Sequence, residues 1–196
     1  TKNWNDSYWL GLLPDDMPIC KISIPGAHDA CTATVSSVGV LANADCQTKT
    51  IKGLLVYGVR YLDCRTRSSG MEIPDEILVK LVNTGINFTE QLFKIELNKY
   101  KHDGIAWTFH GPMACGESLE TVFQHVTDFL DSHTSEFVIM RVAYEALGWA
   151  PLEQDFDKSV SVGLFHDVEK KFSDRILPYR PDMKLGEARN HILLIN

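Results

Sequence analysis

The chain has 196 residues, 44% of them hydrophobic and 23% charged, which suits one globular domain and excludes a disordered or fibrous protein. Its formal charge of −7 argues against a protein that follows a nucleic-acid backbone and against docking on anionic lipid by charge alone. The longest uncharged run, 30–44, is shorter than the roughly 20 apolar residues of a membrane-spanning helix. Because the sequence starts at Thr1 without a leader, we expect a processed product that has lost its signal peptide.

The cysteines are odd in number, and their spacing matches neither a zinc site nor a disulfide scaffold. We therefore expect mostly buried free thiols. One disulfide, between Cys31 and Cys46, stays open as an alternative. The five are Cys20, Cys31, Cys46, Cys64 and Cys115.

Hydrophobic patterning predicts strands and helices that alternate along the chain. A short helix over 4–13 comes first, followed by a strand over 20–24 that ends at Pro25 and Gly26. The other predicted strands are 59–65, 105–109, 137–142 and 191–195. The other predicted helices are 47–56, 117–132 and 156–172, and the last two carry apolar residues at helical spacing. This alternation indicates a parallel sheet with right-handed crossovers.

Two features depart from a regular barrel. The segment 68–104 separates the second and third predicted strands and is interpreted as a helical insertion. The fifth strand runs to the end of the sequence, whereas an eight-stranded barrel usually takes about 250 residues. We expect the front part of a longer domain, or a short one completed by a partner chain.

Polar residues gather at the ends of three predicted strands. His28 and Asp29 follow the first strand, Asp63 and Arg65 share one face of the second, and His110 ends the third. Taken singly, each has a structural explanation as a turn histidine or an internal ion pair. Together, two imidazoles and an arginine suit cleavage of a phosphodiester by an internal hydroxyl, with no metal required.

The motifs that carry these residues resemble, in order, the phosphatidylinositol-specific phospholipase C X-domain family. They are ISIPGAHD at 22–29, GVRYLDCR at 58–65, FHG at 109–111, the helix and strand over 129–140, and KLGEAR at 184–189. The resemblance implies that residues 1–196 form an X-like domain, which is an α/β protein of the TIM-like barrel type with only the first five or so strands present.

The resemblance also implies a role for each site residue. His28 is the general base on the inositol 2-hydroxyl, and His110, assisted by Asp29, is the general acid toward the diacylglycerol oxygen. Arg65 stabilises the phosphate and Asp63 hydrogen-bonds the site. Arg65 is typical of the metal-independent bacterial branch, so no metal and no other cofactor is expected. The products would be diacylglycerol and inositol 1,2-cyclic phosphate.

Some positions depart from the family pattern. Ala143 stands where the bacterial branch has an inositol-binding lysine, and Arg141 is the nearest basic residue and a second candidate substrate contact. The late-strand carboxylate that orients the general base is absent. An inactive inositol-lipid-binding module therefore stays open as an alternative.

Two further alternatives fit less well. A metal-dependent glycerophosphodiesterase or sphingomyelinase D-like barrel needs acidic ligands near the first histidine, which Arg65 fits poorly. An RNA-cleaving enzyme conflicts with the charge of −7. The expected partner is a phosphatidylinositol-type lipid met by peripheral membrane contact, with the uncharged run 32–44 as a candidate docking surface, and no nucleic acid. The expected location is extracellular or at the cell surface.

Overall fold

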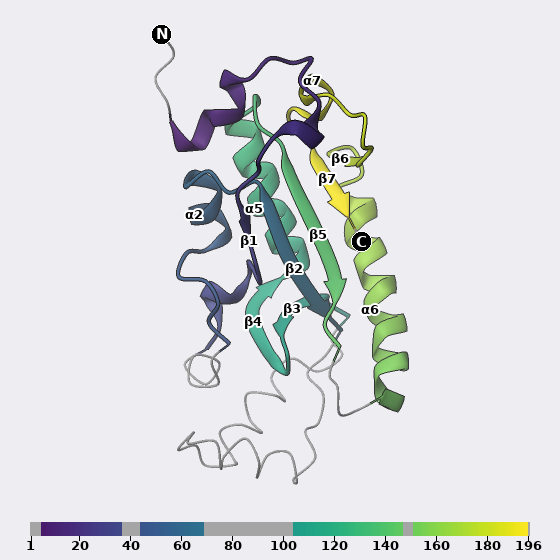
Figure 1. Cartoon of the computed structure of the whole chain (residues 1–196). Helices are drawn as coiled ribbons and strands as arrows, with labels where there is room; N and C mark the ends of the chain where they lie inside the picture. Colours follow the sequence, from purple (N-terminus) through teal and green to yellow (C-terminus); the bar gives the residue numbers. More distant parts are fainter. Residues whose placement is uncertain (1–4, 37–43, 69–103, 147–150, 196) are drawn as a thin grey trace.

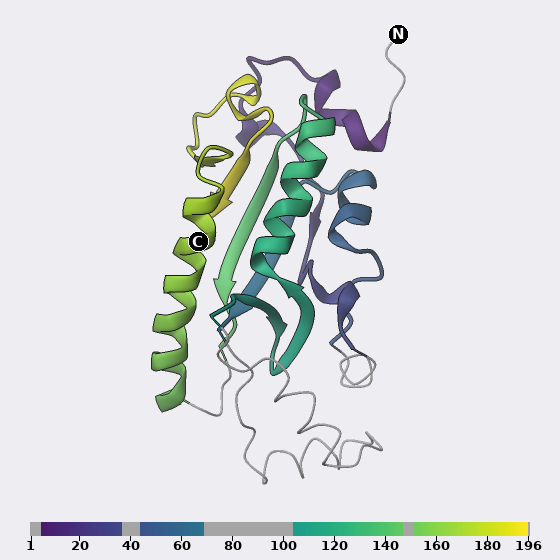
Figure 2. The same cartoon turned by 180° about the vertical axis from the view of Figure 1, so that it is seen from behind.

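The structure is a computed structural model, and it describes residues 5–36, 44–68, 104–146 and 151–195 (Figure 1). A twisted sheet runs through the middle, with α5 lying across one face and α2 and α6 flanking it (Figure 2). The predicted insertion at 68–104 falls almost wholly outside the described residues, as does most of the run 32–44. None of the described helices is long and apolar enough to cross a membrane.

Seven strands make up the sheet, in the order β4-β3-β2-β5-β7-β6, with β1 also paired to β2. Their bounds are β1 Gly26–Ala27, β2 Tyr61–Arg67, β3 Trp107–His110, β4 Met113–Ser118, β5 Val138–Tyr144, β6 Ile176–Pro178 and β7 Ile192–Ile195. The pairs β1–β2, β2–β5, β5–β7 and β6–β7 are parallel. Within the described ranges the sheet does not close on itself, as expected for part of a TIM-like barrel.

The helices lie close to their predicted positions. They are α2 Ile51–Val56, α5 Leu119–Ser132, α6 Pro151–Lys171 and α7 Leu185–Ala188, with 3-10 helices η1 Asp6–Leu12, η2 Ile19–Lys21 and η3 Thr32–Thr34. The hydroxyls of Thr50 and Ser118 accept hydrogen bonds from the first turns of α2 and α5, which fixes where these helices begin. The predicted helix over 4–13 is the 3-10 helix η1.

The predicted strand over 20–24 is wrong. Cys20 lies in η2, and the chain joins the sheet only after Pro25, whose carbonyl oxygen accepts hydrogen bonds from Arg60 N and Tyr61 N. Ile22 and Ile24 pack against the apolar cluster at the amino ends of the strands. The alternation in the sequence therefore reflects packing on that cluster instead of pairing in a ladder.

The third predicted strand has the wrong direction. Gly111 and Pro112 turn β3 directly into β4, and a short turn permits only antiparallel pairing. β3 therefore runs back along β2, with Thr108 opposite Thr66. The strands β4 and β6 were not predicted, because one contains Gly116 and the other is three residues long.

All five cysteines are free, so the alternative disulfide is wrong. Cys31, Cys64 and Cys115 are buried, whereas Cys20 and Cys46 are exposed. Burial raises the pKa of Cys115, and a hydrogen bond with Cys64, followed by burial, raises the pKa of Cys31. The thiols of Cys31 and Cys115 are thus held in the neutral form that an apolar core requires.

The two faces of the sheet differ in polarity. Leu62 and Met140 point outward into the core formed with α2, α5 and α6. On the inner face, the amino ends carry an apolar cluster that includes Ile139 and Leu193, with Tyr61 packed against it. Side chains two residues further along β2 and β5 share this inner face but are charged. The inner face therefore changes from apolar to polar toward the carboxyl ends of the strands.

A buried ion pair anchors the start of β2. Arg60 donates from Nε to Glu136 Oε2 over 3.0 Å, and both side chains are fully buried. Arg60 also donates to the carbonyl oxygens of Leu55, Val59 and Ser7. Every N–H on this guanidinium thus has an acceptor close by, which is the condition under which a buried charge is tolerated.

Replacing Glu136 by glutamine is expected to lower the free energy of unfolding by about 3–5 kcal/mol, because it leaves the Arg60 charge buried without a counter-charge. Urea denaturation measures the change. The control is Asp131→Asn, which breaks the exposed pair with Arg175 and is expected to cost less than about 1 kcal/mol. Equal effects of the two variants would contradict the anchoring role.

Candidate active site

The structure brings all six predicted site residues together on the inner face. They come from four elements, namely the end of β1, the middle of β2, the end of β3 and the middle of β5. When the antiparallel register of β3 is continued along β2, His110 lies opposite Cys64. The site therefore lies beside the middle of β2 and not beyond its carboxyl end. The six are His28, Asp29, Asp63, Arg65, His110 and Arg141.

Asp29 is the hub of this cluster. Its Oδ2 lies 3.0 Å from His28 Nε2 and 2.9 Å from His110 Nδ1, and its Oδ1 lies 2.8 Å from Arg65 Nε. The residue is buried and has a φ of +45°, in the left-handed region. A non-glycine residue held there at a charged site is a strained position of the kind that clusters at functional sites.

His28 is the most exposed member, with 67% of its side chain accessible. Its Nδ1 lies 3.0 Å from Asp63 Oδ2, and Gln47 Nε2 donates to its carbonyl oxygen over 2.7 Å. Asp63 therefore contacts the nitrogen that an orienting carboxylate would contact. From the sequence, that carboxylate was expected only on a late strand.

Arg65 bridges three carboxylates. Besides Asp29, it contacts Glu145 Oε2 at 3.0 Å and Asp63 Oδ2 at 3.6 Å. Burial alone lowers the pKa of a guanidinium, but the hydrogen bond to Glu145 and the charges of all three carboxylates outweigh it and raise the pKa of Arg65. The Arg65 guanidinium is thus a permanent positive charge among the three carboxylates.

Glu145 is a site residue that the sequence analysis missed. It follows β5 directly, and its Oε1 accepts a 2.6 Å hydrogen bond from the backbone N–H of Gly111. Gly111 has a φ of +53°, which the turn after His110 requires and which glycine adopts without strain. A carboxylate just past the carboxyl end of a barrel strand is a recognisable signal. Glu145 therefore ties the turn that carries His110 to Arg65.

Arg141 contacts the site from β5. It donates from NH1 to Asp63 Oδ1 over 2.7 Å. Burial would raise the pKa of Asp63, but this hydrogen bond and the charges of Arg65 and Arg141 outweigh it and hold the pKa below its usual value. Asp63 is therefore kept ionised and able to support a cationic imidazole at His28.

The Arg141→Gln variant is expected to raise the pKa of Asp63, because it removes the hydrogen bond that lowers it. A depressed folded-state pKa contributes stability that is present above about pH 4 and is lost as the pH falls through the folded-state value. In the variant this contribution should be smaller, and its loss should be complete at a higher pH. Carboxyl-carbon NMR titration of Asp63 measures the shift, and an unchanged titration would show that Arg141 does not set it.

Cys46 lies beside His110 and Asp29. Its Sγ is 3.6 Å from His110 Nδ1 and 3.8 Å from Asp29 Oδ2. Partial burial and the charge of Asp29 raise the pKa of this thiol. From the sequence, Cys46 was expected to be a free thiol or, alternatively, the disulfide partner of Cys31, and neither expectation placed it at the site.

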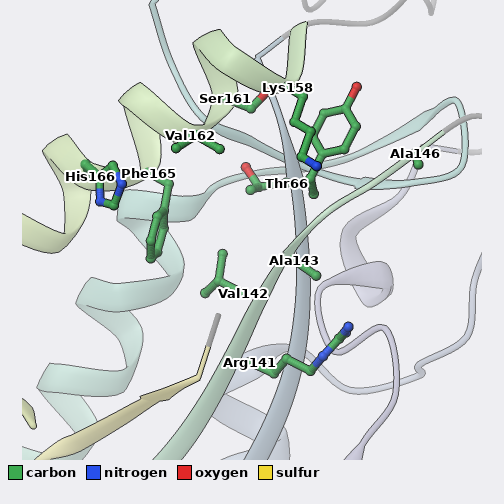
Figure 3. A pocket seen from close by; sticks show the side chains of 11 residues that line it. Thr66, Arg141, Val142, Ala143, Ala146, Lys158, Ser161, Val162, Phe165 and His166 are labelled. Carbon is green, nitrogen blue, oxygen red and sulfur yellow. The ribbon is translucent and has the colours of Figure 1, made fainter. Parts of the chain in front are cut away.

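Two cavities border β5. The first, about 450 Å³, lies at the site and is lined by Gly26, Ala27, His28, Tyr61, Asp63 and Arg141. The second, about 500 Å³, lies between β5 and α6, and its lining includes Ala143, Lys158, Phe165 and His166 (Figure 3). Arg141 borders both, and in Figure 3 its side chain extends away from α6. The first cavity, which His28 and Asp63 line, is therefore the one that belongs to the site.

A comparison of the sequence and a comparison of the fold with known proteins find the same group of enzymes. A curated relative, the 1-phosphatidylinositol phosphodiesterase of Listeria monocytogenes, is 26% identical over 153 residues, which are 73% of this chain and 37% of the relative. The solved phosphatidylinositol-specific phospholipase C from L. monocytogenes covers 98% of the chain with a TM-score of 0.65 at 20% identity. The chain resembles bacterial phosphatidylinositol-specific phospholipases C.

This result confirms the resemblance that the motifs predicted. A variant of the phosphatidylinositol-specific phospholipase C from Staphylococcus aureus also covers 97% of the chain, with a TM-score of 0.66 at 16% identity. No family model matches the sequence. The chain spans 37% of the length of the curated relative and 57% and 52% of the two solved phospholipases C.

Proposed function

We propose that this chain carries the active site of a phosphodiesterase that cleaves phosphatidylinositol-type lipids. The inositol 2-hydroxyl attacks the phosphorus, the bond to the diacylglycerol oxygen breaks, and the products are diacylglycerol and inositol 1,2-cyclic phosphate. One observation carries the proposal, namely that Asp29 Oδ2 lies between the imidazoles of His28 and His110, with Arg65 on its other oxygen. The curated relative acts on the same class of lipid by name.

His28 is assigned the role of general base. Its Nδ1 faces Asp63, so the imidazolium that forms on accepting a proton gains a carboxylate partner. Its Nε2 faces Asp29 in the free protein, and the substrate hydroxyl must replace this contact. The exposure of His28 permits that exchange, because an inositol ring can approach it from solvent.

His110 is assigned the role of general acid. As an imidazolium it donates from Nδ1 to Asp29, which leaves Nε2–H free to protonate the departing oxygen. Arg65 lies on the opposite oxygen of Asp29 and is the nearest fixed cation for the phosphate. Because it is a guanidinium, it can present two N–H groups to phosphate oxygens.

The charges of the cluster fit this division of labour. Three carboxylates, Asp29, Asp63 and Glu145, face two guanidinium groups, Arg65 and Arg141. One protonated histidine balances the remaining negative charge. The reaction needs that same state, with one imidazole protonated as acid and the other neutral as base.

A second candidate function is binding of inositol lipids without cleavage. It is favoured by Ala143, which lies opposite Arg65 in the sheet and supplies no charge at the position of the expected lysine. In this reading Arg141 and Arg65 hold the headgroup phosphate and the histidines stay paired with their carboxylates. Turnover distinguishes the two functions.

The proposed partner is a membrane that contains phosphatidylinositol. One solved structure of the S. aureus enzyme, with a TM-score of 0.62, concerns the modulation of its membrane binding. Peripheral contact would bring the exposed His28 to the lipid headgroup. The domain assignment for 1–196 and an extracellular or cell-surface location also stay as predictions.

Phosphorus NMR of the products tests the proposed reaction. The protein is incubated with vesicles of phosphatidylinositol in phosphatidylcholine and, in parallel reactions, with a glycerophosphodiester and with an RNA. We expect the inositol 1,2-cyclic phosphate signal from the vesicles alone and no loss of rate with a chelator. Vesicle binding without product would favour the binding module, and preferential cleavage of either other substrate would overturn both functions.

A further inference from the structure

We propose that Cys46, His110 and Asp29 form a Zn²⁺ site that inhibits the enzyme. The proposed reaction assigns no role to Cys46, although its sulfur lies beside the general acid and the hub carboxylate. One ligand atom from each of the three residues lies within 4.8 Å of the other two. They come from three separate segments, so a single ion could reach all of them only because of the fold.

The separations of the ligand atoms suit a tetrahedral zinc ion. With zinc bonds of about 2.0–2.1 Å to nitrogen or oxygen and about 2.3 Å to sulfur, neighbouring ligands lie about 3.5 Å apart when one is sulfur. Sγ of Cys46 is 3.6 Å from His110 Nδ1 and 3.8 Å from Asp29 Oδ2. Nδ1 and Oδ2 are 2.9 Å apart and must open to about 3.3 Å. Small side-chain rotations are sufficient for this change.

The ligand types favour zinc over harder ions. A thiolate and an imidazole select Zn²⁺, whereas Mg²⁺ and Ca²⁺ prefer oxygen ligands alone. The thiolate and the Asp29 carboxylate together balance the charge of the ion once the thiol proton has passed to solvent. Cys46 is exposed and 31% of the His110 side chain is accessible, so the ion can enter and a water can complete the tetrahedron.

A second group of potential ligands, His28, Asp29 and Asp63, is less suited to a metal. The two ring nitrogens of His28 face different carboxylates, so one ion cannot use both contacts. Asp63 is already paired with Arg141, and the group contains no sulfur. Zinc is therefore assigned to the group that includes Cys46.

Zinc in this site would block the general acid, an effect that rests on the proposed function. The ion takes the lone pair of His110 Nδ1 and the Asp29 oxygen that would otherwise stabilise the imidazolium. The zinc-bound imidazole keeps its Nε2–H but is a weaker acid than the imidazolium that Asp29 would otherwise stabilise, so the departing oxygen is protonated less readily. Inhibition should be reversible, because a chelator removes the ion without altering the protein.

Competition with a chromophoric chelator tests the binding without reference to activity. The wild-type protein should bind a single equivalent of Zn²⁺, and Cys46→Ser and His110→Gln should each weaken binding by at least about tenfold. Cys20→Ser is the matched control, because Cys20 is the other exposed cysteine and lies in η2. With Co²⁺ as a probe, a thiolate charge-transfer band should appear in the wild type and be missing in Cys46→Ser.

Wild-type affinity in Cys46→Ser, or absence of stoichiometric binding by the wild type, would overturn the site. Lipid cleavage is measured separately, with each variant compared with its own metal-free rate. Zinc should inhibit the wild type and Cys20→Ser and spare Cys46→Ser. Cysteine-dependent binding in a protein that cleaves no lipid would sink the proposed function and leave the zinc site standing. Equal inhibition of the wild type and of both cysteine variants would refute the inhibitory role.

Discussion

Replacing His110 by alanine is expected to lower kcat for phosphatidylinositol by about 10²–10⁴-fold, the range for loss of a general acid or base. Arg65 and Arg141 cannot replace it, since guanidinium groups do not release protons near neutral pH. His28→Ala should lose a similar factor. Initial rates of cyclic phosphate release measure both.

The two histidines can be told apart with a second substrate. A phosphodiester whose leaving group is an acidic phenol needs little protonation, so it should restore much of the rate of His110→Ala. It should not rescue His28→Ala, because the hydroxyl must still be deprotonated. His166→Ala is the control, since this exposed histidine pairs with Glu169 beside the second cavity. A loss in that variant equal to the other two would show that the site is misplaced.

The second large effect is expected from Arg65→Lys, which should reduce kcat by about 10²–10³-fold, as for removal of a preorganised charge donor. A lysine keeps the charge but lacks the planar fork that reaches Asp29 and Glu145 together and presents two N–H groups to a phosphate. Rates on phosphatidylinositol vesicles measure the loss. Circular dichroism checks that the variant is folded.

The control for Arg65→Lys is the same exchange at Arg180, which is half exposed and pairs with Glu187 on the surface. That variant should keep its full rate. If Arg65→Lys were as active as the control, Arg65 would be only an internal ion-pair partner. The sequence leaves that simpler explanation open.

The predictable parts of the molecule are those encoded locally. The amphipathic stripe of α5 and the apolar runs of β5 and β7 indicate these elements without reference to the rest of the chain. Their predicted positions agree with the structure to within a few residues. The motif at 22–29 also located His28 and Asp29, but its alternating apolar residues misled the strand assignment. In that segment, tertiary packing overrides the local pattern.

The parts that could not be predicted depend on contacts between distant residues. Cys46 meets His110 across 64 positions, and no spacing rule connects them. The sequence does contain the direction of β3, because the short turn at Gly111 excludes a crossover connection. The alternation of strands and helices nevertheless favours the parallel arrangement that was predicted. Glu145 was overlooked because its partners lie on two other elements.

The hairpin of β3 and β4 separates the two halves of the proposed chemistry mechanically. The base is fixed by β1 and β2, inside the parallel part of the sheet, whereas the acid is carried by a hairpin that joins β2 only near Thr66 and Arg67. Substitutions in the hairpin could therefore retune which leaving group is tolerated without disturbing recognition of the attacking alcohol. A scaffold divided in this way offers protein engineers one adjustment for each side of the phosphorus, coupled through Asp29, which contacts both histidines.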